Sequence, residues 1–181
     1  MRIFTCFGLF LALFILPSCD MDPSDTELNH YAPCCTEGPF VGMVGAGKLY
    51  IPNMITTNFD GINDVFYPLV GPNIEKIENF EIRTAGGQLL FSRAFLTLND
   101  PGQGWNAAVS STEVYRGLFR YKMEVTDVNG VREILEGTAC AFACDAAPDD
   151  IGDVNNCYYP VQHDGAGGLD PNLPNLETEC F

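Results

Sequence analysis

The sequence predicts an all-β protein, an Ig-like or Greek-key β-sandwich of roughly seven strands with irregular, disulfide-stapled N- and C-terminal extensions. Three observations support this fold class. Apolar and polar residues alternate in short runs between residues 48 and 142. Glycine- and asparagine-rich turn sequences separate these runs, and no long stretch repeats with the helical period of about 3.6 residues.

Residues 1–18 are typical of a signal peptide, because Arg2 precedes an apolar run from Ile3 to Leu16. About 14 apolar residues reach about 21 Å as a helix, too short for a hydrocarbon core of about 30 Å. The sequence Leu16-Pro17-Ser18-Cys19 resembles the lipobox of bacterial lipoproteins. The resemblance implies cleavage before Cys19 and a covalent lipid on it; the alternative is an ordinary signal peptide that leaves Cys19 as a thiol.

The charge balance excludes nucleic acid as a partner. Without residues 1–18, the chain has eight basic and 24 acidic residues, and no Lys or Arg follows Arg132. Binding a phosphate backbone requires clustered cations that displace counterions. The same negative charge keeps the protein body away from an anionic bilayer, so we expect the lipid on Cys19 to be the membrane contact.

Residues 19–47 are expected to form an acidic tether that also holds Cys34 and Cys35. Asp20, Asp22, Asp25 and Glu27 follow the lipobox directly. Such a stretch resembles the surface-export signals of lipoproteins in bacteria that display them outside the cell, while a merely solvated linker is the alternative. The resemblance implies a lipid-anchored protein of the outer membrane, exposed at the cell surface.

Apart from Cys6 and Cys19, the chain has an even set of six cysteines: Cys34, Cys35, Cys140, Cys144, Cys157 and Cys180. Disulfides are the default state of such a set in an exported protein. A bond between adjacent Cys34 and Cys35 would close a strained ring, so both are expected to bond into the Cys140–Cys180 set. A metal–thiolate site is disfavoured, because the spacings lack Cys-x-x-Cys pairs and only His30 and His163 accompany them.

Residues 48–142 hold the predicted strands. The clearest runs from Tyr115 to Asp127, and Asn129-Gly130, suited to a type I′ turn, predicts an antiparallel return over Val131 to Thr138. A second hairpin is predicted from Ile74 to Thr84, a Gly86-Gly87 turn, and Gln88 to Ala94. Trp105 is expected in the core or at its rim.

Residues 143–181 form the predicted acidic, cysteine-containing tail. From Thr138 onward there are eight acidic and no basic side chains, and Asp, Asn, Gly and Pro dominate, so regular secondary structure is not expected. Disulfides are expected to fold both extensions along one edge of the sandwich. Tyr158 and Tyr159 are expected either to bind a partner or to cover that edge.

Residues 51–70 resemble the opening of the gliding motility-associated C-terminal domain family, most clearly in the run Asp60-Gly61-Ile62-Asn63-Asp64-Val65-Phe66. The family's further features follow in the same order over residues 50–142: Gly86-Gly87, Leu89-Leu90-Phe91, Gly104-Trp105-Asn106 and Gly117-Leu118-Phe119-Arg120-Tyr121. Two features depart from the family: an insertion separates Asn53 from Asp60, and Thr84-Ala85 replaces the usual Asn-Arg-Trp.

The resemblance implies a relation to the sorting domains of type IX secretion. Those domains commonly end their chains, whereas here about forty residues follow Phe142 and the N-terminus carries its own lipid signal. We therefore expect a retained structural module.

Asn58, Asp60, Asn63 and Asp64 place four oxygen-bearing side chains within seven residues, which suits calcium. The order of a regular calcium loop and its distal Glu are missing, so side chains that cap their own turn are the favoured interpretation.

No catalytic constellation stands out, and no cofactor is predicted beyond the lipid and this possible calcium ion. We expect a non-catalytic accessory or structural subunit of an outer-membrane complex for assembly, secretion or uptake. Its expected partners are an integral outer-membrane barrel protein and other lipoproteins. The alternative is a lipid-anchored adhesin or carbohydrate-binding module of the gliding or cell-surface apparatus.

Overall fold

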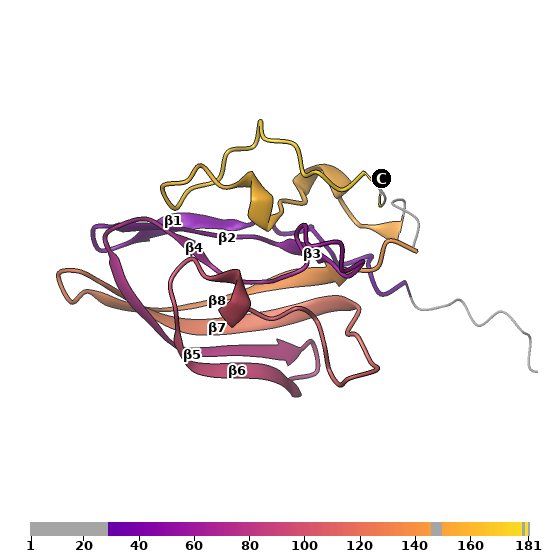
Figure 1. The fold of residues 1–181 in the computed structure, drawn as a ribbon, viewed down its shortest axis with the longest axis horizontal. Coiled ribbons are helices and arrows are strands. Elements are labelled where there is room, and N and C mark those ends of the chain that lie inside the picture. Colours follow the sequence, from indigo (N-terminus) through magenta and orange to yellow (C-terminus); the bar gives the residue numbers. More distant parts are fainter. Residues whose placement is uncertain (1–28, 146–149, 179, 181) are drawn as a thin grey trace, which may run out of the picture.

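The computed structural model describes residues 29–145, 150–178 and 180. Within them, eight strands form a sandwich of two sheets, with strand orders β1-β2-β4 and β3-β8-β7-β5-β6 (Figure 1). The strands are β1 (Phe40–Val44), β2 (Gly47–Ile51), β3 (Met54–Thr56), β4 (Leu69–Val70), β5 (Ile74–Thr84), β6 (Leu89–Leu96), β7 (Gly117–Asp127) and β8 (Arg132–Phe142). The all-β sandwich predicted from the sequence is therefore confirmed.

Both predicted hairpins are present. β5 pairs with β6, and β7 pairs with β8 from Gly117↔Ala141 to Thr126↔Arg132. A type I′ turn needs a positive φ at both central residues. Gly130 has a positive φ but Asn129 does not, so the expected turn type is wrong. Asp127 instead closes a three-residue loop: its carbonyl accepts from Gly130 N, and its side chain accepts from Ala46, Asn129 and Val131 N–H groups. These N–H groups lower the pKa of Asp127.

The main core lies between the sheets, where alternate residues of the long strands point inward. Phe66, Trp105 and Phe119 meet there edge to face, with ring centroids 4.8 and 5.0 Å apart. Trp105 is 2 % exposed, so it belongs to the core and not to its rim. Phe66 and Trp105 also exchange backbone hydrogen bonds, which joins the Asp60–Phe66 run to the Gly104–Asn106 corner.

The sandwich begins earlier than residue 48. β1 pairs with β2 from Phe40↔Ile51 to Val44↔Gly47, so the second half of the expected tether is a strand of the smaller sheet. Gly42 interrupts this strand and Gly45 follows it. The alternation of exposed and buried positions is therefore too short to recognise in the sequence. With β1 and the short β3 and β4, the count is eight strands instead of about seven.

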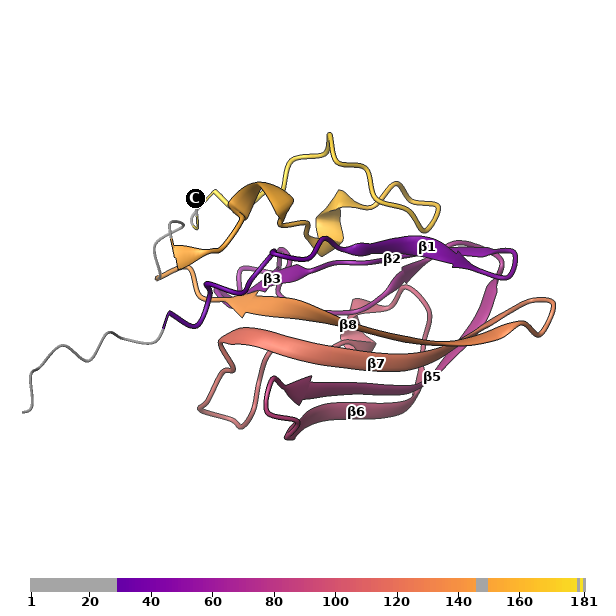
Figure 2. The ribbon, with the colours of Figure 1, turned by 180° about the vertical axis from the view of Figure 1, so that it is seen from behind.

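The described part of the tail crosses the smaller sheet as irregular chain that includes the short 3-10 helices η3 (Val154–Asn156) and η4 (Pro160–Gln162). It runs along β1 and β2, while the outer face of the five-stranded sheet faces the viewer uncovered in Figure 2. Backbone N–H groups of Asn53 and Met54 donate to Tyr158 O, so the tail also covers the β3 edge. The expected edge contact is thus only part of what the tail does: it also covers a face.

The predicted signal peptide, Cys19 and the acidic residues up to Glu27 lie outside the described residues. In the part of the chain that is described, no helix is long and apolar enough to cross a membrane.

Candidate functional site

The tail is joined to the sandwich at the end where the N-terminal extension also enters. Three disulfides link Cys34 to Cys140, Cys35 to Cys157 and Cys144 to Cys180. Adjacent Cys34 and Cys35 therefore bond into the later set, as expected. A second core of buried residues surrounds these bonds and includes Tyr31, Met54, Phe142, Ile151 and Tyr159. We call this region, with the loop and tail residues described next, the junction.

Asn53 connects the three segments of the junction. Its side-chain NH₂ donates to the carbonyls of Glu37 and Asn156, at 2.9 and 2.8 Å, and its Oδ1 accepts from Tyr158 N at 2.7 Å. The side chain is almost fully buried. Because a buried amide is stable only with its partners in place, this residue fixes the tail against both β3 and the N-terminal extension.

The loop proposed for calcium caps itself. Asp64 accepts from the N–H groups of Phe59 and Gly61, at 2.8 and 2.6 Å, and Asp60 accepts from Ile62 N and Asn58 Nδ2. Asn63 has a positive φ and turns toward the tail. The favoured interpretation of turn-capping side chains describes this geometry, and calcium binding stays a prediction.

Glu177 reaches into the junction from the tail and is 2 % exposed. Its Oε1 accepts from Asn63 Nδ2 at 2.7 Å and from Thr56 Oγ1 at 3.0 Å, while Asn63 Oδ1 accepts from Val161 N. Burial raises the pKa of Glu177, and these two hydrogen bonds oppose the rise. Loop, strand β3 and tail thus share one buried polar cluster.

Cys144, Cys180 and Glu177 offer three metal-binding atoms within 4.8 Å of one another. Because both sulfur atoms are joined in a disulfide, neither is a thiolate, and the oxidised junction has no sulfur ligand for a metal there.

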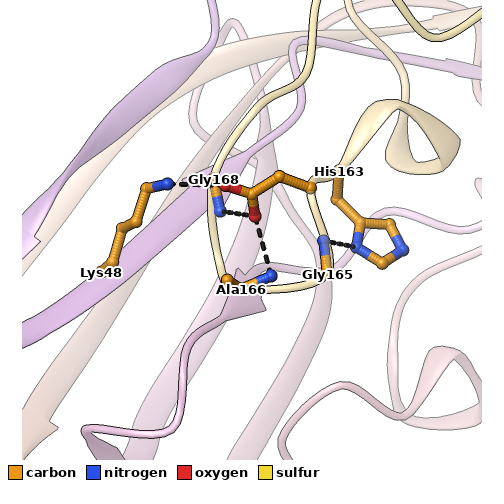
Figure 3. A network of polar contacts seen from close by, with 6 residues as sticks. Lys48, His163, Gly165, Ala166 and Gly168 are labelled. Atoms are coloured by element: carbon orange, nitrogen blue, oxygen red, sulfur yellow. Dashed lines mark hydrogen bonds and ion pairs between the residues drawn. The ribbon is translucent and has the colours of Figure 1, made fainter.

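A glycine-rich loop of the tail is fastened to β2, as Figure 3 shows. Lys48 Nζ lies 2.6 Å from Asp164 Oδ2, and Asp164 Oδ1 accepts from Ala166 N and Gly168 N. The Lys48 hydrogen bond, followed by these N–H groups, lowers the pKa of Asp164 to about 2. Beside it, His163 Nδ1 accepts from Gly165 N at 3.1 Å.

A hollow of about 320 Å³ opens where the Gly61–Tyr67 loop meets the tail, and a second hollow of about 130 Å³ adjoins it. Both are lined by Tyr67 and His163, so we treat them as one feature, the junction groove. The remaining lining of the larger hollow is mostly apolar and includes Val65, Pro160, Val161 and Leu176.

The uncovered outer face of β5, β6, β7 and β8, here called the open face, is the other candidate surface. It holds five of the eight basic residues outside the signal peptide: Lys76, Arg83, Arg120, Lys122 and Arg132. Strand register places like charges opposite each other twice, at Glu78↔Glu124 and Arg83↔Arg120. Arg132 bridges the two glutamates, whereas no carboxylate in the described ranges lies within ion-pair distance of Arg120.

The open face also carries exposed apolar side chains and a hollow. Phe95 and Ile134 are 70 % and 62 % exposed. Phe95 lies opposite Glu78 and Ile134 lies opposite Glu124, so the two apolar side chains flank the pair of glutamates. A hollow of about 330 Å³ lies among Glu81, Arg83, Arg120, Lys122, Glu136 and Thr138. A surface of this kind suits contact with another protein.

The sequence pattern indicates the cysteines and the acidic loop, but not the residues that hold the tail against the sandwich. Lys48 and Asp164 are 116 positions apart, and Asn63 and Glu177 are 114 apart. Only the loop-like composition of Asp164–Gly168 marked that segment in the sequence. Tyr158 and Tyr159 cover the β3 edge, as one of the two alternatives expected: Tyr158 O accepts from Asn53 N and Met54 N, and Tyr159 is 1 % exposed, with its carbonyl accepting from Tyr50 OH. Partner binding by half-buried Tyr158 stays a prediction.

No family model matches the chain, and no curated protein matches it. Among solved structures, it is similar to CopC from Methylosinus trichosporium OB3b, with 14 % sequence identity and a TM-score of 0.34. The match covers 58 % of this chain and 94 % of that one. This similarity is too low to assign a function to the chain.

Proposed function

We propose that this chain is a surface-exposed outer-membrane lipoprotein, a non-catalytic accessory subunit of an outer-membrane protein complex for assembly, secretion or uptake. The observation that carries the proposal is the difference between its two faces. The stapled tail covers the smaller sheet, whereas the larger sheet is open and concentrates the basic residues of an acidic protein.

Arg120 is the point on the open face where a partner is most needed. It lies opposite Arg83, and like charges directly across a strand pair are unfavourable. Arg83 is held by Glu81 at 2.9 Å, which leaves Arg120 without a carboxylate in the described part of the chain. A carboxylate from a partner, placed in the adjoining hollow, would satisfy Arg120, and Phe95 and Ile134 would supply apolar contact.

The position of the N-terminal extension is compatible with anchoring. The described chain enters at the junction end, and Cys34 ties it to Cys140 of the long strand β8 (Figure 1). A lipid on Cys19 would then hold the protein by that end and leave the open face accessible.

The test is affinity purification of the full-length, tagged protein from detergent-solubilised outer membranes. An integral barrel protein and other lipoproteins should co-purify at a fixed ratio, and Arg120→Glu should lower their recovery about tenfold. The matched control is Arg116→Glu, an exposed arginine just before β7 that pairs with Asp145. Recovery of the protein alone, or equal recovery with Arg120→Glu, would contradict the proposal.

A further inference from the structure

The junction groove has the size and the lining of a small-ligand site. Its larger hollow, about 320 Å³, lies at the lower end of the range for such sites, about 300–1,000 Å³. The groove exists only because the tail docks on the Gly61–Tyr67 loop, so segments nearly 100 residues apart form most of its walls, and Asn99 and Pro101 complete them. It shares no residue with the hollow on the open face.

Most polar groups in the walls are already engaged within the protein. Asp64 caps its own loop, Asn63 bonds to the tail, and Asn99 exchanges hydrogen bonds with both backbone groups of Val70. Two groups remain. Within the described residues, the Tyr67 hydroxyl has no protein partner, and neither has Nε2 of His163.

The hydrogen bond to His163 fixes what this ring offers to a ligand. Nδ1 accepts from Gly165 N, so the neutral ring carries its proton on Nε2. The groove therefore presents a donor from His163 and a hydroxyl from Tyr67, beside the half-buried ring of Tyr67 and the apolar side chains of Val65 and Leu176. Burial raises the pKa of Tyr67, so its hydroxyl stays protonated.

The charge around the groove selects against anions. Asp64 lines it, and the charge of Asp100 contributes to the raised pKa of Tyr67. No Lys or Arg is among its lining residues, and the nearby Lys48 is paired with Asp164. A phosphate, a carboxylate or an acidic sugar would meet repulsion without a compensating cation.

From these observations we propose that the junction groove binds a short neutral saccharide. A pyranose ring has an apolar C–H face that can lie on the Tyr67 ring, and its hydroxyls can bond to His163 Nε2–H and Tyr67 OH. This inference goes beyond the subunit role and does not depend on it. It gives the carbohydrate-binding alternative raised by the sequence a specific location.

Binding is tested with the full-length protein in detergent, titrated by calorimetry with neutral disaccharides (cellobiose, maltose, lactose and N,N′-diacetylchitobiose). At least one should bind with a dissociation constant of about 1 mM or tighter. Tyr67→Ala should weaken that binding by about tenfold or more, and Leu176→Trp, which fills the groove, should abolish it. Leu173→Trp is the matched control, because Leu173 is an exposed tail leucine that does not line the groove.

The urea midpoint, followed by far-UV circular dichroism, verifies that each variant is folded, because Leu176→Trp and Leu173→Trp add a second tryptophan to Trp105. The proposal is overturned if no neutral disaccharide binds the folded protein, if an anionic uronic-acid disaccharide binds as tightly, or if Leu176→Trp binds like wild type. Tighter binding of a proline-rich peptide than of any saccharide would also overturn it. Recovery of complexes through Arg120 should be unaffected by Leu176→Trp, so failure here is distinguishable from failure of the subunit role.

Discussion

Removal of the Cys35–Cys157 bond by Cys35→Ser with Cys157→Ser should destabilise the protein by about 3 kcal/mol. An isolated loop with a sequence separation of 122 would give about 5 kcal/mol from chain entropy. The Cys34–Cys140 bond remains in this variant and already holds Cys35 close to Cys140. The Cys35–Cys157 bond therefore closes only the loop of about 18 residues from Cys140 to Cys157. Because this loop is smaller, the expected loss in the free energy of unfolding is about 3 kcal/mol instead of about 5 kcal/mol.

The free energy of unfolding is measured by urea denaturation without reductant, with Trp105 fluorescence as the core probe. Limited proteolysis should show cleavage of the tail in the variant before the sandwich is lost. Cys144→Ser with Cys180→Ser is the comparison, since it leaves the tail stapled at Cys157. A loss near 5 kcal/mol would refute the shortened-loop reasoning, and a loss below about 1 kcal/mol would show that the bond does not hold the tail.

Two further predictions concern carboxylates of the tail. Folding lowers the pKa of Asp164 to about 2, so its contribution is present above about pH 4 and is lost as pH falls toward 2. Lys48→Gln should therefore reduce stability at neutral pH, and the difference from wild type should shrink over that window in urea denaturation. Burial raises the pKa of Glu177, so the folded protein binds this proton more tightly, and wild-type stability falls as pH rises through the raised pKa. Glu177→Gln keeps an acceptor for Asn63 and Thr56; it should be more stable than wild type at neutral pH, and a variant less stable there would contradict the assignment.

The long hairpins could be predicted from sequence because each signal is local. Alternation over Tyr115–Asp127 and the following Asn129-Gly130 define both strands and the place of the turn. The turn type could not be predicted, because it depends on the Asp127 side chain, which accepts four hydrogen bonds, one of them from Ala46 N between β1 and β2. β1 was missed for a related reason: its five residues include Gly42 and gain their order from pairing with β2.

The candidate sites were less predictable, because both depend on contacts between distant segments. The Asp60–Asp64 run was recognisable as a polar turn, but nothing near Glu177 indicates that it meets Asn63 and Thr56. The strained ring that adjacent Cys34 and Cys35 would close disfavoured a bond between them, whereas the choice among the remaining partners required the fold. Arg120 is ordinary in the sequence, and only strand register shows that it faces Arg83.

The open face is expected to meet a partner, while the stapled tail covers the opposite sheet. Site-specific photo-crosslinking in living cells tests it most directly, with a photoreactive residue at Lys122 on the open face or at Asn172 on the tail. We expect an adduct with an integral outer-membrane protein from position 122 and none from position 172. An adduct from position 172 alone, or none from position 122 in cells that hold the lipid-anchored protein, would contradict it.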